Sequence, residues 1–453
     1  MNILLLGNGA REHCIAESLT KSGRVKLATY AKAKNPGIFG LSEQYQLGSY
    51  TDFPAIRDFA KRVKPDFAFL GPDDPIADGV ADLLLEAGIH SVAPLKTVAR
   101  LESSKSFTRD LVQKYGILGN PKFKIFYETA GVKQFLEELG GNFVVKADGL
   151  MAGKGVLVSG EHLAGIEDGE QYAKKCIEKF GRVVIEEKLI GQEFSLMSFV
   201  DGVHVKDMVP VQDHKRAFVD DKGKNTGGMG SYSASNHLLP FLTQKDLDDA
   251  HAITEKVASA LFKETGAQFK GIMYGGFMVV RDGVKLIEYN ARFGDPEVMN
   301  VLPILKTDFV EICEAILYGN LDKIKIEFEA KATVCKYIVP EGYPDKPRAG
   351  EKIEITIDPT SYPASAGPRH GGGKLQATSL KMYYASVDQK PDGLYLSSSR
   401  AIAFVGIADN LENAEKIAQS ACGSVKGPVF YRPDIGTKAL IEKRVEMMRK
   451  LRG

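Results

Sequence analysis

Short apolar runs alternate with helical stretches at the start of the chain. Strands are predicted at residues 2–6, 27–30 and 67–70, and helices at residues 12–22 and 53–63. This alternation is typical of a parallel sheet, which binds its ligands at the carboxyl ends of its strands. We therefore expect an α/β fold that begins with a Rossmann-like parallel-sheet domain.

Two glycine-containing loops follow strands of this predicted sheet. The first has the sequence GNG at residues 7–9, and the second has GPD at residues 71–73. A dinucleotide-binding fingerprint needs a third glycine where Glu12 stands, so that motif is incomplete. Arg11 beside the first loop suits a small phosphate or carboxylate. Both loops are candidates for binding an anionic substrate.

A loop rich in lysine and glycine spans residues 146–156, with the sequence KADGLMAGKGV, straight after the apolar run 143–145. Glycines allow backbone N–H groups and lysines to approach phosphates closely. The loop is not a Walker A motif, because three residues separate Gly149 from Gly153 and a glycine follows Lys154. It predicts phosphate binding without the P-loop helix, and the alternative is a flexible, solvated hairpin.

A β-hairpin is predicted over residues 272–290, because a DG turn at 282–283 separates two alternating apolar runs. Side chains alternate along a strand, so Glu288 and Asn290 share one face. A carboxylate and an amide oxygen suit Mg²⁺, which completes its shell with water and phosphate. The alternative is a polar strand end that faces water. The position opposite Glu288 falls at residue 276 or 277, neither of which is acidic.

Another apolar run begins at Val183 and ends in a short polar linker from Glu186 to Leu189. The backbone of this linker could donate and accept hydrogen bonds at an adenine edge, and Glu193 could accept them from ribose hydroxyls. An ordinary strand and turn is the alternative.

Taken in order, these features resemble the ATP-grasp superfamily: Lys105 after a serine-rich segment, the glycine loop, the polar linker, and the strand with Glu288 and Asn290. Longer blocks are similar to the phosphoribosylamine–glycine ligase family, also called glycinamide ribonucleotide synthetases. These blocks are GNGAREH at 7–13, the 146–156 loop, QDHKR at 212–216, NTGGMGSY at 225–232 and NARFGDPE at 290–297. The similarity thins beyond residue 340.

The resemblance implies a three-domain organisation, in line with the chain length. The expected parts are an N-terminal Rossmann-like substrate-binding domain at 1–104, an ATP-grasp domain at 105–326 with a small lid at about 120–190, and a C-terminal mixed α+β domain at 327–453. In the last domain we predict strands at 333–339, 352–357, 394–398 and 401–405, and a helix at 413–420. The stretch 360–393, rich in Gly, Pro and Ser, predicts a surface connection.

The resemblance implies an ATP-dependent carbon–nitrogen ligase of de novo purine biosynthesis. Glycine would be joined to 5-phosphoribosylamine through a glycyl phosphate, giving glycinamide ribonucleotide, ADP and phosphate. ATP would be a co-substrate, and Mg²⁺ or Mn²⁺ the metal. Two alternatives stay open, namely another ATP-grasp carboxylate–amine ligase and a non-catalytic nucleotide-binding regulator.

The resemblance also implies roles for individual residues. The expected catalytic residues are Arg292, Asp213 and Lys146. The expected ATP-binding residues are Lys105, Lys146, Gly149, Gly153, Lys154, Gly155, Glu186, Glu187, Leu189 and Glu193. The expected substrate-binding residues are Asn8, Gly9, Arg11, Gly71, Asp73, Asp213 and Arg292. The expected metal ligands are Glu288 and Asn290. No site role is assigned to the C-terminal domain.

The composition is compatible with such an enzyme. The 453 residues are 44% hydrophobic and 26% charged, an ordinary globular balance. A net charge of +1 produces no field that would attract nucleic acid or an anionic membrane. Five cysteines without CxxC spacing favour reduced thiols in a cytoplasm, and the N-terminus lacks the basic region of a signal peptide. We expect no nucleic acid, membrane or obligatory protein partner.

Overall fold

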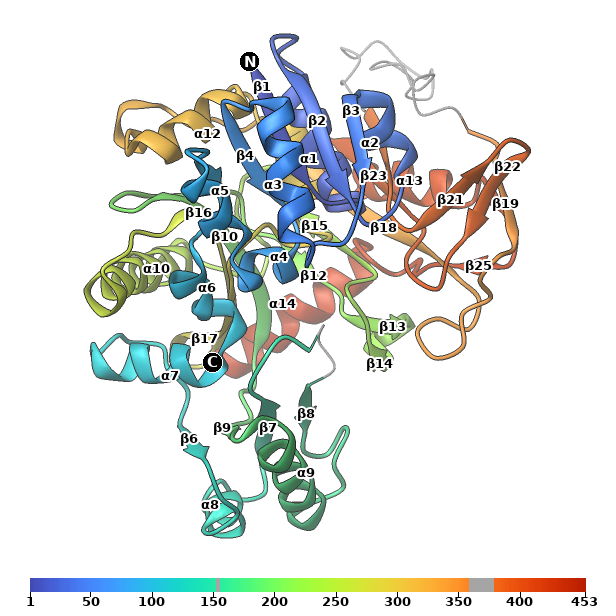
Figure 1. The fold of residues 1–453 in the computed structure, drawn as a ribbon. Helices are drawn as coiled ribbons and strands as arrows, with labels where there is room; N and C mark the ends of the chain where they lie inside the picture. Colours follow the sequence, from blue (N-terminus) through green and yellow to red (C-terminus); the bar gives the residue numbers. More distant parts are fainter. Residues whose placement is uncertain (152–154, 358–378) are drawn as a thin grey trace.

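The computed structural model describes residues 1–151, 155–357 and 379–453 (Figure 1). Its N-terminal part is a parallel sheet with the strand order β3-β2-β1-β4-β5. The strands are β1 (Asn2–Leu6), β2 (Lys26–Ala31), β3 (Ser42–Leu47), β4 (Phe67–Leu70) and β5 (Ser91–Val92). The helices of this part are α1 (Ala10–Thr20), α2 (Pro36–Leu41), α3 (Phe53–Val63), α4 (Asp73–Asp78), α5 (Val80–Glu86) and α6 (Lys96–Ser103). The predicted Rossmann-like domain is confirmed.

The central strands place the two glycine-containing loops next to each other. β1 and β4 are almost entirely buried, as expected of strands with both faces covered. They pair directly, and the N–H of Gly71 donates to the carbonyl of Leu6 at 3.0 Å. The loop at residues 7–9 and the loop at residues 71–73 therefore lie at the same edge of the sheet.

The central body is built on an antiparallel sheet with the order β11-β10-β16-β17. Its strands are β10 (Gln192–Asp201), β11 (Val205–Asp207), β16 (Lys270–Val280) and β17 (Gly283–Asn290). Helices α7 (Lys105–Lys114), α10 (Gln244–Thr265), α11 (Val298–Val301) and α12 (Phe309–Tyr318) belong to the same part of the chain. β16 and β17 form the predicted hairpin, and its turn brings the end of β17 opposite Tyr274 to Gly276.

A small separate sheet projects from the body at the bottom of Figure 1. Its order is β6-β9-β7-β8, and all its pairs are antiparallel. The elements are β6 (Phe123–Phe126), α8 (Val132–Glu138), β7 (Phe143–Ala147), β8 (Val156–Val158), α9 (Ile166–Phe180) and β9 (Val183–Glu187). These elements bury a hydrophobic cluster of their own, so the small sheet has a core distinct from that of the body.

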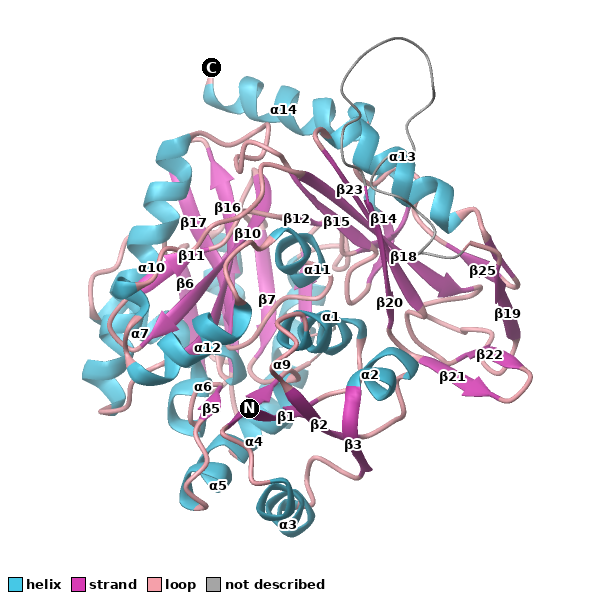
Figure 2. Ribbon diagram, turned by 90° about the horizontal axis from the view of Figure 1, so that it is seen from above, coloured by secondary structure: helices cyan, strands magenta, loops and turns pink. Residues whose placement is uncertain are grey.

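The C-terminal sheet combines strands from two distant parts of the chain (Figure 2). Its path is β12-β15-β18-β23-β20, with β25 also paired to β18. The strands are β12 (Gln212–Asp213), β15 (Gly230–Ser233), β18 (Ala332–Pro340), β20 (Ser379–Tyr384), β23 (Ile402–Ala408) and β25 (Val429–Phe430). The strand that carries Asp213 is thus the outermost strand of a sheet made mainly by the C-terminal domain.

The rest of the C-terminal part is a second sheet and two helices. The sheet order is β21-β22-β19-β24, with β19 (Lys352–Ile355), β21 (Val387–Lys390), β22 (Gly393–Leu396) and β24 (Val425–Lys426). The helices are α13 (Leu411–Cys422) and α14 (Lys438–Arg452). The predicted surface connection at 360–393 is wrong over its second half, because β20 and β21 are strands of the two sheets. Residues 360–378 lie outside the described residues.

The remaining short elements are β13 (Arg216–Phe218), β14 (Lys222–Asn225), η1 (Val219–Asp221), η2 (Leu302–Ile304) and η3 (Leu321–Lys323). Within the described part of the chain, no helix combines the length and apolar character needed to cross a membrane.

Candidate active site

The end of β17 presents the two predicted metal ligands, Glu288 and Asn290. Glu288 lies opposite Gly276 on β16, so the facing strand contributes no side chain there. Glu288 Oε1 is 3.7 Å from the ammonium group of Lys215. Burial raises the pKa of Glu288, but the charges of Lys215 and Lys105 outweigh burial and leave this pKa below its ordinary value. The carboxylate is therefore held ionised.

This donor set fits a hard divalent cation that binds few protein oxygens. Glu288 supplies an ionised carboxylate and Asn290 an amide oxygen from the same face of β17. No group of three or more His, Cys, Asp or Glu side chains that could hold a metal occurs among the described residues. A cation held by these two side chains would complete its shell with water and phosphate.

Arg292 lies two residues after the end of β17 and is held from two sides. Its Nη2 lies 3.0 Å from Glu102 Oε1 and donates to Asn290 Oδ1 at 3.2 Å. Glu102 also accepts the backbone N–H of Ala291 at 2.7 Å, which fixes the start of this loop. The buried Nε of Arg292 has no hydrogen-bond partner among the described residues. A buried N–H without a partner marks a position for a water or ligand oxygen.

Lys146 belongs to a buried ion cluster that joins the small sheet to the body. Its ammonium group lies 2.7 Å from Glu186 Oε2 and donates to the carbonyl of Ile287 at 3.1 Å. Arg109 binds both oxygens of Glu186, at 2.6 and 3.0 Å. Burial lowers the pKa of Lys146 more than Glu186 raises it. The Glu186 carboxylate thus positions the Lys146 ammonium group next to β17.

Two other predicted ATP-binding residues, Lys105 and Glu187, bind backbone groups. Lys105 donates to the carbonyl of Gly149 at 2.9 Å, and Gly149 adopts a φ of 147°, which favours glycine. Glu187 accepts the backbone N–H of Lys122 at 2.8 Å. Three further predicted residues are placed in and beside the linker and the loop, namely Gly155, Leu189 and Glu193. Gly153 and Lys154 lie outside the described residues.

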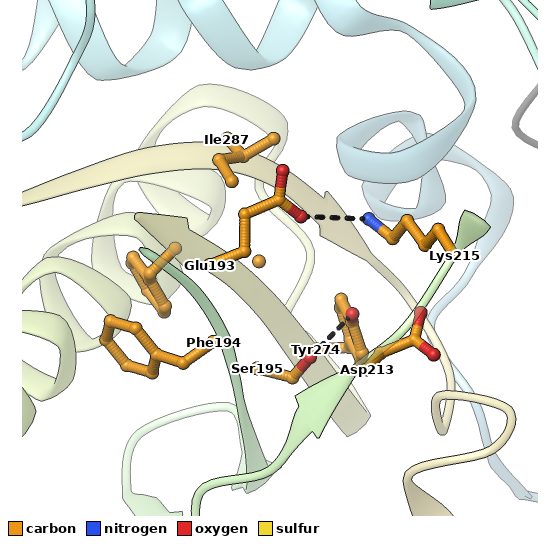
Figure 3. Close-up of a pocket in the computed structure, with 9 residues that line it drawn as sticks. Glu193, Phe194, Ser195, Asp213, Lys215, Tyr274 and Ile287 are labelled. Atoms are coloured by element: carbon orange, nitrogen blue, oxygen red, sulfur yellow. Dashed lines mark hydrogen bonds and ion pairs between the residues drawn. The ribbon is translucent and has the colours of Figure 1, made fainter. Parts of the chain in front are cut away.

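A small pocket lies beside β10, β12 and β16 (Figure 3). Its lining consists of Glu193, Phe194, Ser195, Asp213, Lys215, Tyr274, Gly276, Phe277 and Ile287. In Figure 3, Lys215 points toward Glu193, and the Tyr274 hydroxyl meets Ser195. Glu297 accepts hydrogen bonds from Tyr274 at 2.8 Å and from Ser195 at 2.9 Å. Burial, and then the charge of Glu297, raises the pKa of Asp213 well above its ordinary value.

The predicted substrate-binding residues of the N-terminal domain cluster around Glu12. Glu12 binds Arg11 Nε at 2.6 Å and the backbone N–H of Gly9 at 2.7 Å. A Cβ at residue 71 would lie 2.4 Å from the Glu12 side chain, so this position needs the glycine found there. Arg11 also donates to the carbonyl of Phe293 at 3.3 Å, and this contact links the cluster to the loop after β17.

Asn8 and Asp73 complete this side of the site. Asn8 Oδ1 accepts a hydrogen bond from the Tyr50 hydroxyl at 3.0 Å. Burial raises the pKa of Asp73, but the charges of Arg292 and Arg11 outweigh burial and leave it below its ordinary value. The field of Arg292 therefore reaches the N-terminal domain as well as β17.

Several residues of the site have no role in the sequence analysis. Lys215 lies within the QDHKR block and Glu297 within the NARFGDPE block, so the motifs pointed to them. Glu12 lies within the GNGAREH block, whereas Glu102 is recognisable only by its contacts. Arg400 lies in a serine-rich segment without a motif, yet it pairs with Asp295 at 2.9 Å.

Family models match most of the chain. The N domain of phosphoribosylglycinamide synthetase matches residues 1–102, the ATP-grasp (A) domain residues 103–298, and the C domain residues 333–438. Among curated relatives, a phosphoribosylamine–glycine ligase of Methanocaldococcus jannaschii is 49% identical over 100% of both chains. One from Methanococcus maripaludis is 48% identical, also over 100% of both chains.

Solved structures agree with these matches. A phosphoribosylamine–glycine ligase from Thermotoga maritima aligns with a TM-score of 0.77 and 26% identity, covering 96% of this chain and 100% of that chain. The biotin carboxylase domain of a Hydrogenobacter thermophilus 2-oxoglutarate carboxylase aligns with a TM-score of 0.70 and 16% identity, covering 99% and 93% of the two chains. The latter shares the fold.

Proposed function

The chain belongs to the phosphoribosylamine–glycine ligase family. From this premise we propose which of its residues perform each part of the ATP-dependent ligation of glycine to 5-phosphoribosylamine. In this reaction of purine biosynthesis, a carbon–nitrogen bond forms as ATP is consumed. We propose a glycyl phosphate intermediate: the γ-phosphoryl group moves to a carboxylate oxygen of glycine. The amine then attacks the carbonyl carbon and phosphate leaves. No enzyme nucleophile is needed, so positioning and charge neutralisation supply the catalysis.

Arg292 and Asp213 would hold glycine by its two charged ends. The Arg292 guanidinium matches the carboxylate, and its unpartnered Nε supports an oxygen ligand at this position. Asp213, at the pocket beside Tyr274 and Lys215, would accept the ammonium group or the reacting amine. The ordering of Arg292 by Glu102 supports this assignment, because a fixed guanidinium needs no reorganisation when the substrate arrives.

Lys105, Lys146 and Lys154 would neutralise the phosphates of ATP, with backbone N–H groups of Gly149, Gly153 and Gly155 beside them. The linker that contains Glu186, Glu187 and Leu189 would bind the adenine through its backbone, and Glu193 the ribose. The engagement of the Glu186 carboxylate with Arg109 and Lys146 supports a backbone role for this residue. Glu288 and Asn290 would hold Mg²⁺ or Mn²⁺, and the bound cation would offset charge on the phosphates.

The N-terminal cluster would bind phosphoribosylamine. Asn8, Gly9 and Arg11 would hold its phosphate, and Gly71 and Asp73 its ribose. The contact between Arg11 and the carbonyl of Phe293 supports this arrangement, because it brings the cluster to the loop that begins with Arg292.

We propose the domain division 1–104, 105–326 and 327–453, with about 120–190 acting as a lid. The separate core of the small sheet supports movement of this segment as a unit. We also propose a cytoplasmic protein that needs no nucleic acid, membrane or obligatory protein partner. Its cysteines, Cys14, Cys176, Cys313, Cys335 and Cys422, are free and buried, which supports a reducing compartment.

Product formation is expected only when ATP, Mg²⁺, glycine and freshly prepared phosphoribosylamine are all present. Release of ADP and formation of glycinamide ribonucleotide should then be equal, and omission of either glycine or the amine should leave only background hydrolysis. Coupled ADP release together with mass spectrometry of the product checks this result. Equal turnover with other amino acids or amines would contradict the assignment of the two substrates.

The raised pKa of Asp213 gives an expected pH dependence. An ammonium group binds the ionised carboxylate, so kcat/KM for glycine should rise with pH through a pKa above the ordinary aspartate value. Burial is the main cause of the raised pKa and the charge of Glu297 the next, so Glu297→Gln should move the rise to lower pH. Profiles of kcat/KM against pH for both proteins measure this. If the pH profile of Glu297→Gln matched that of the wild-type protein, the charge of Glu297 would not be a cause of the raised pKa of Asp213.

A further inference from the structure

Arg400 lies just before β23 in the C-terminal domain, and its guanidinium reaches the candidate active site. Nη1 donates to the carbonyl oxygens of Gly227 at 2.6 Å and Gly228 at 3.0 Å. Nη2 donates to Asp295 Oδ2 at 2.9 Å. The side chain is 14% exposed and lies 4.4 Å from the centre of the Tyr337 ring. One largely enclosed guanidinium therefore joins three segments of the chain.

The first of these segments forms a wall beside Asp213. Gly228 has a φ of 103°, and a Cβ at this position would lie 2.8 Å from Asp213 Oδ1. Gly228 also donates its N–H to Thr226 Oγ1 at 3.1 Å, and Thr226 donates to the carbonyl of Lys215 at 2.8 Å. A displacement of the backbone at residues 227–228 would therefore be felt at Asp213 and at Lys215.

The second segment is the loop from Arg292 to Glu297, with Asp295 inside it. Asp295 Oδ1 accepts a hydrogen bond from the Tyr337 hydroxyl at 2.6 Å, and Oδ2 accepts one from Arg400. Both carboxylate oxygens are thus bound by groups of the C-terminal domain. The loop that presents Arg292 is consequently fixed from the same side as the wall beside Asp213.

We propose that Arg400 is a positioning residue, which sets the spacing between Asp213 and Arg292 by bridging the backbone at 227–228 to Asp295. The proposal rests on the roles proposed above for Asp213 and Arg292. Both terminal nitrogens of Arg400 bind protein groups, so its action on the substrates is through these loops. Arginine presents its donors in a rigid planar fork, whereas a lysine is a flexible point charge, so Arg400→Lys is not expected to keep the same spacing between the two loops.

The test compares Arg400→Ala and Arg400→Lys with Arg348→Ala, an exposed arginine of the same domain that pairs with Glu341. Both Arg400 variants should lose about 100-fold in kcat/KM for glycine and for phosphoribosylamine, the effect of a misplacement near 1 Å. The KM for ATP should stay at the value of the wild-type protein, whereas the melting temperature should fall, because Asp295 loses its ion-pair partner. Methylguanidinium should restore part of the activity of Arg400→Ala, and Arg348→Ala should behave as the unchanged protein.

Three outcomes would overturn the proposal. If KM rose for ATP as well as for the other two substrates, and methylguanidinium restored no activity, Arg400 would be a support of the fold. A loss confined to phosphoribosylamine would make it a ligand of that substrate. Full activity would make the bridge irrelevant. Asp213→Asn and Arg292→Lys are measured in parallel. If these two variants are active, the proposed roles of Asp213 and Arg292 are wrong. If they are inactive while the Arg400 variants are fully active, only the positioning role of Arg400 is wrong.

Discussion

Glu288→Gln is expected to lower ligase activity at limiting Mg²⁺ by about 100-fold or more, because a bound metal ion supplies several kcal/mol of charge stabilisation and the variant would bind it weakly. The substitution keeps the shape of the side chain and removes its charge. The carboxylate it replaces is kept ionised by Lys215, Lys105 and other cations nearby, against the effect of burial. The activity that remains should require a much higher Mg²⁺ concentration.

The measurement is a titration of activity against Mg²⁺ at fixed ATP, together with Mn²⁺ binding followed by electron paramagnetic resonance in the presence of ADP. Glu255→Gln is a suitable control, because Glu255 is 57% exposed on α10 and pairs only with His251 among the described residues. This control should match the unchanged protein. Unaltered Mn²⁺ binding and Mg²⁺ dependence in Glu288→Gln would leave a polar strand end facing water as the better interpretation.

Strands were predictable from the sequence where burial makes them apolar. β1 and β4 are continuous apolar runs at the centre of the parallel sheet, and the sequence predicts both. β3 has the sequence SEQYQL, lies at the edge of that sheet and is largely solvent-exposed, so it has no apolar pattern. β20 and β21 fall in a stretch whose Gly and Pro content predicts a connection. They are strands because β20 pairs with β23 and β21 pairs with β22.

The sequence predicted those residues of the candidate site that lie in recognisable motifs. Motif similarity identified Asp213 and Arg292 because each lies in a block of several characteristic residues, and the alternation of side chains along the predicted hairpin identified Glu288. Arg400 and Glu102 act through contacts with residues more than a hundred positions away along the chain, and no local pattern encodes such contacts. The edge position of β12 in the C-terminal sheet is likewise a property of strand pairing and not of its two residues.

The buried cluster of Arg109, Lys146 and Glu186 gives the largest expected effect on stability. All three side chains are nearly inaccessible, with exposed fractions of 2% for Arg109, 6% for Lys146 and 5% for Glu186. Glu186→Gln removes the only anion among them and leaves two buried cations. Breaking a buried ion pair in this way is expected to cost about 3–5 kcal/mol, because the remaining charge stays desolvated.

The same cluster links β7 and β9 of the small sheet to α7 and β17 of the body, so Glu186→Gln should loosen that junction first. Hydrogen–deuterium exchange should therefore accelerate in β7 and β9, and the melting temperature should fall. Glu187→Gln serves as the control for stability, because Glu187 accepts one backbone hydrogen bond, from Lys122, and should change stability by less than about 1 kcal/mol.

A pH series tests the cause of the Glu186→Gln effect. Burial already lowers the pKa of Lys146, and Glu186 is the main charge that raises it, with Glu288 a smaller one, so this pKa should fall further without Glu186. Between this lowered pKa and the higher pKa of an unfolded lysine, the unfolded state binds more protons than the folded state, and the stability of the folded state rises with pH. The stability deficit of Glu186→Gln relative to the unchanged protein should therefore shrink as the pH rises. A deficit that is the same at every pH would show that lost packing, and not an unpaired lysine, destabilises the variant.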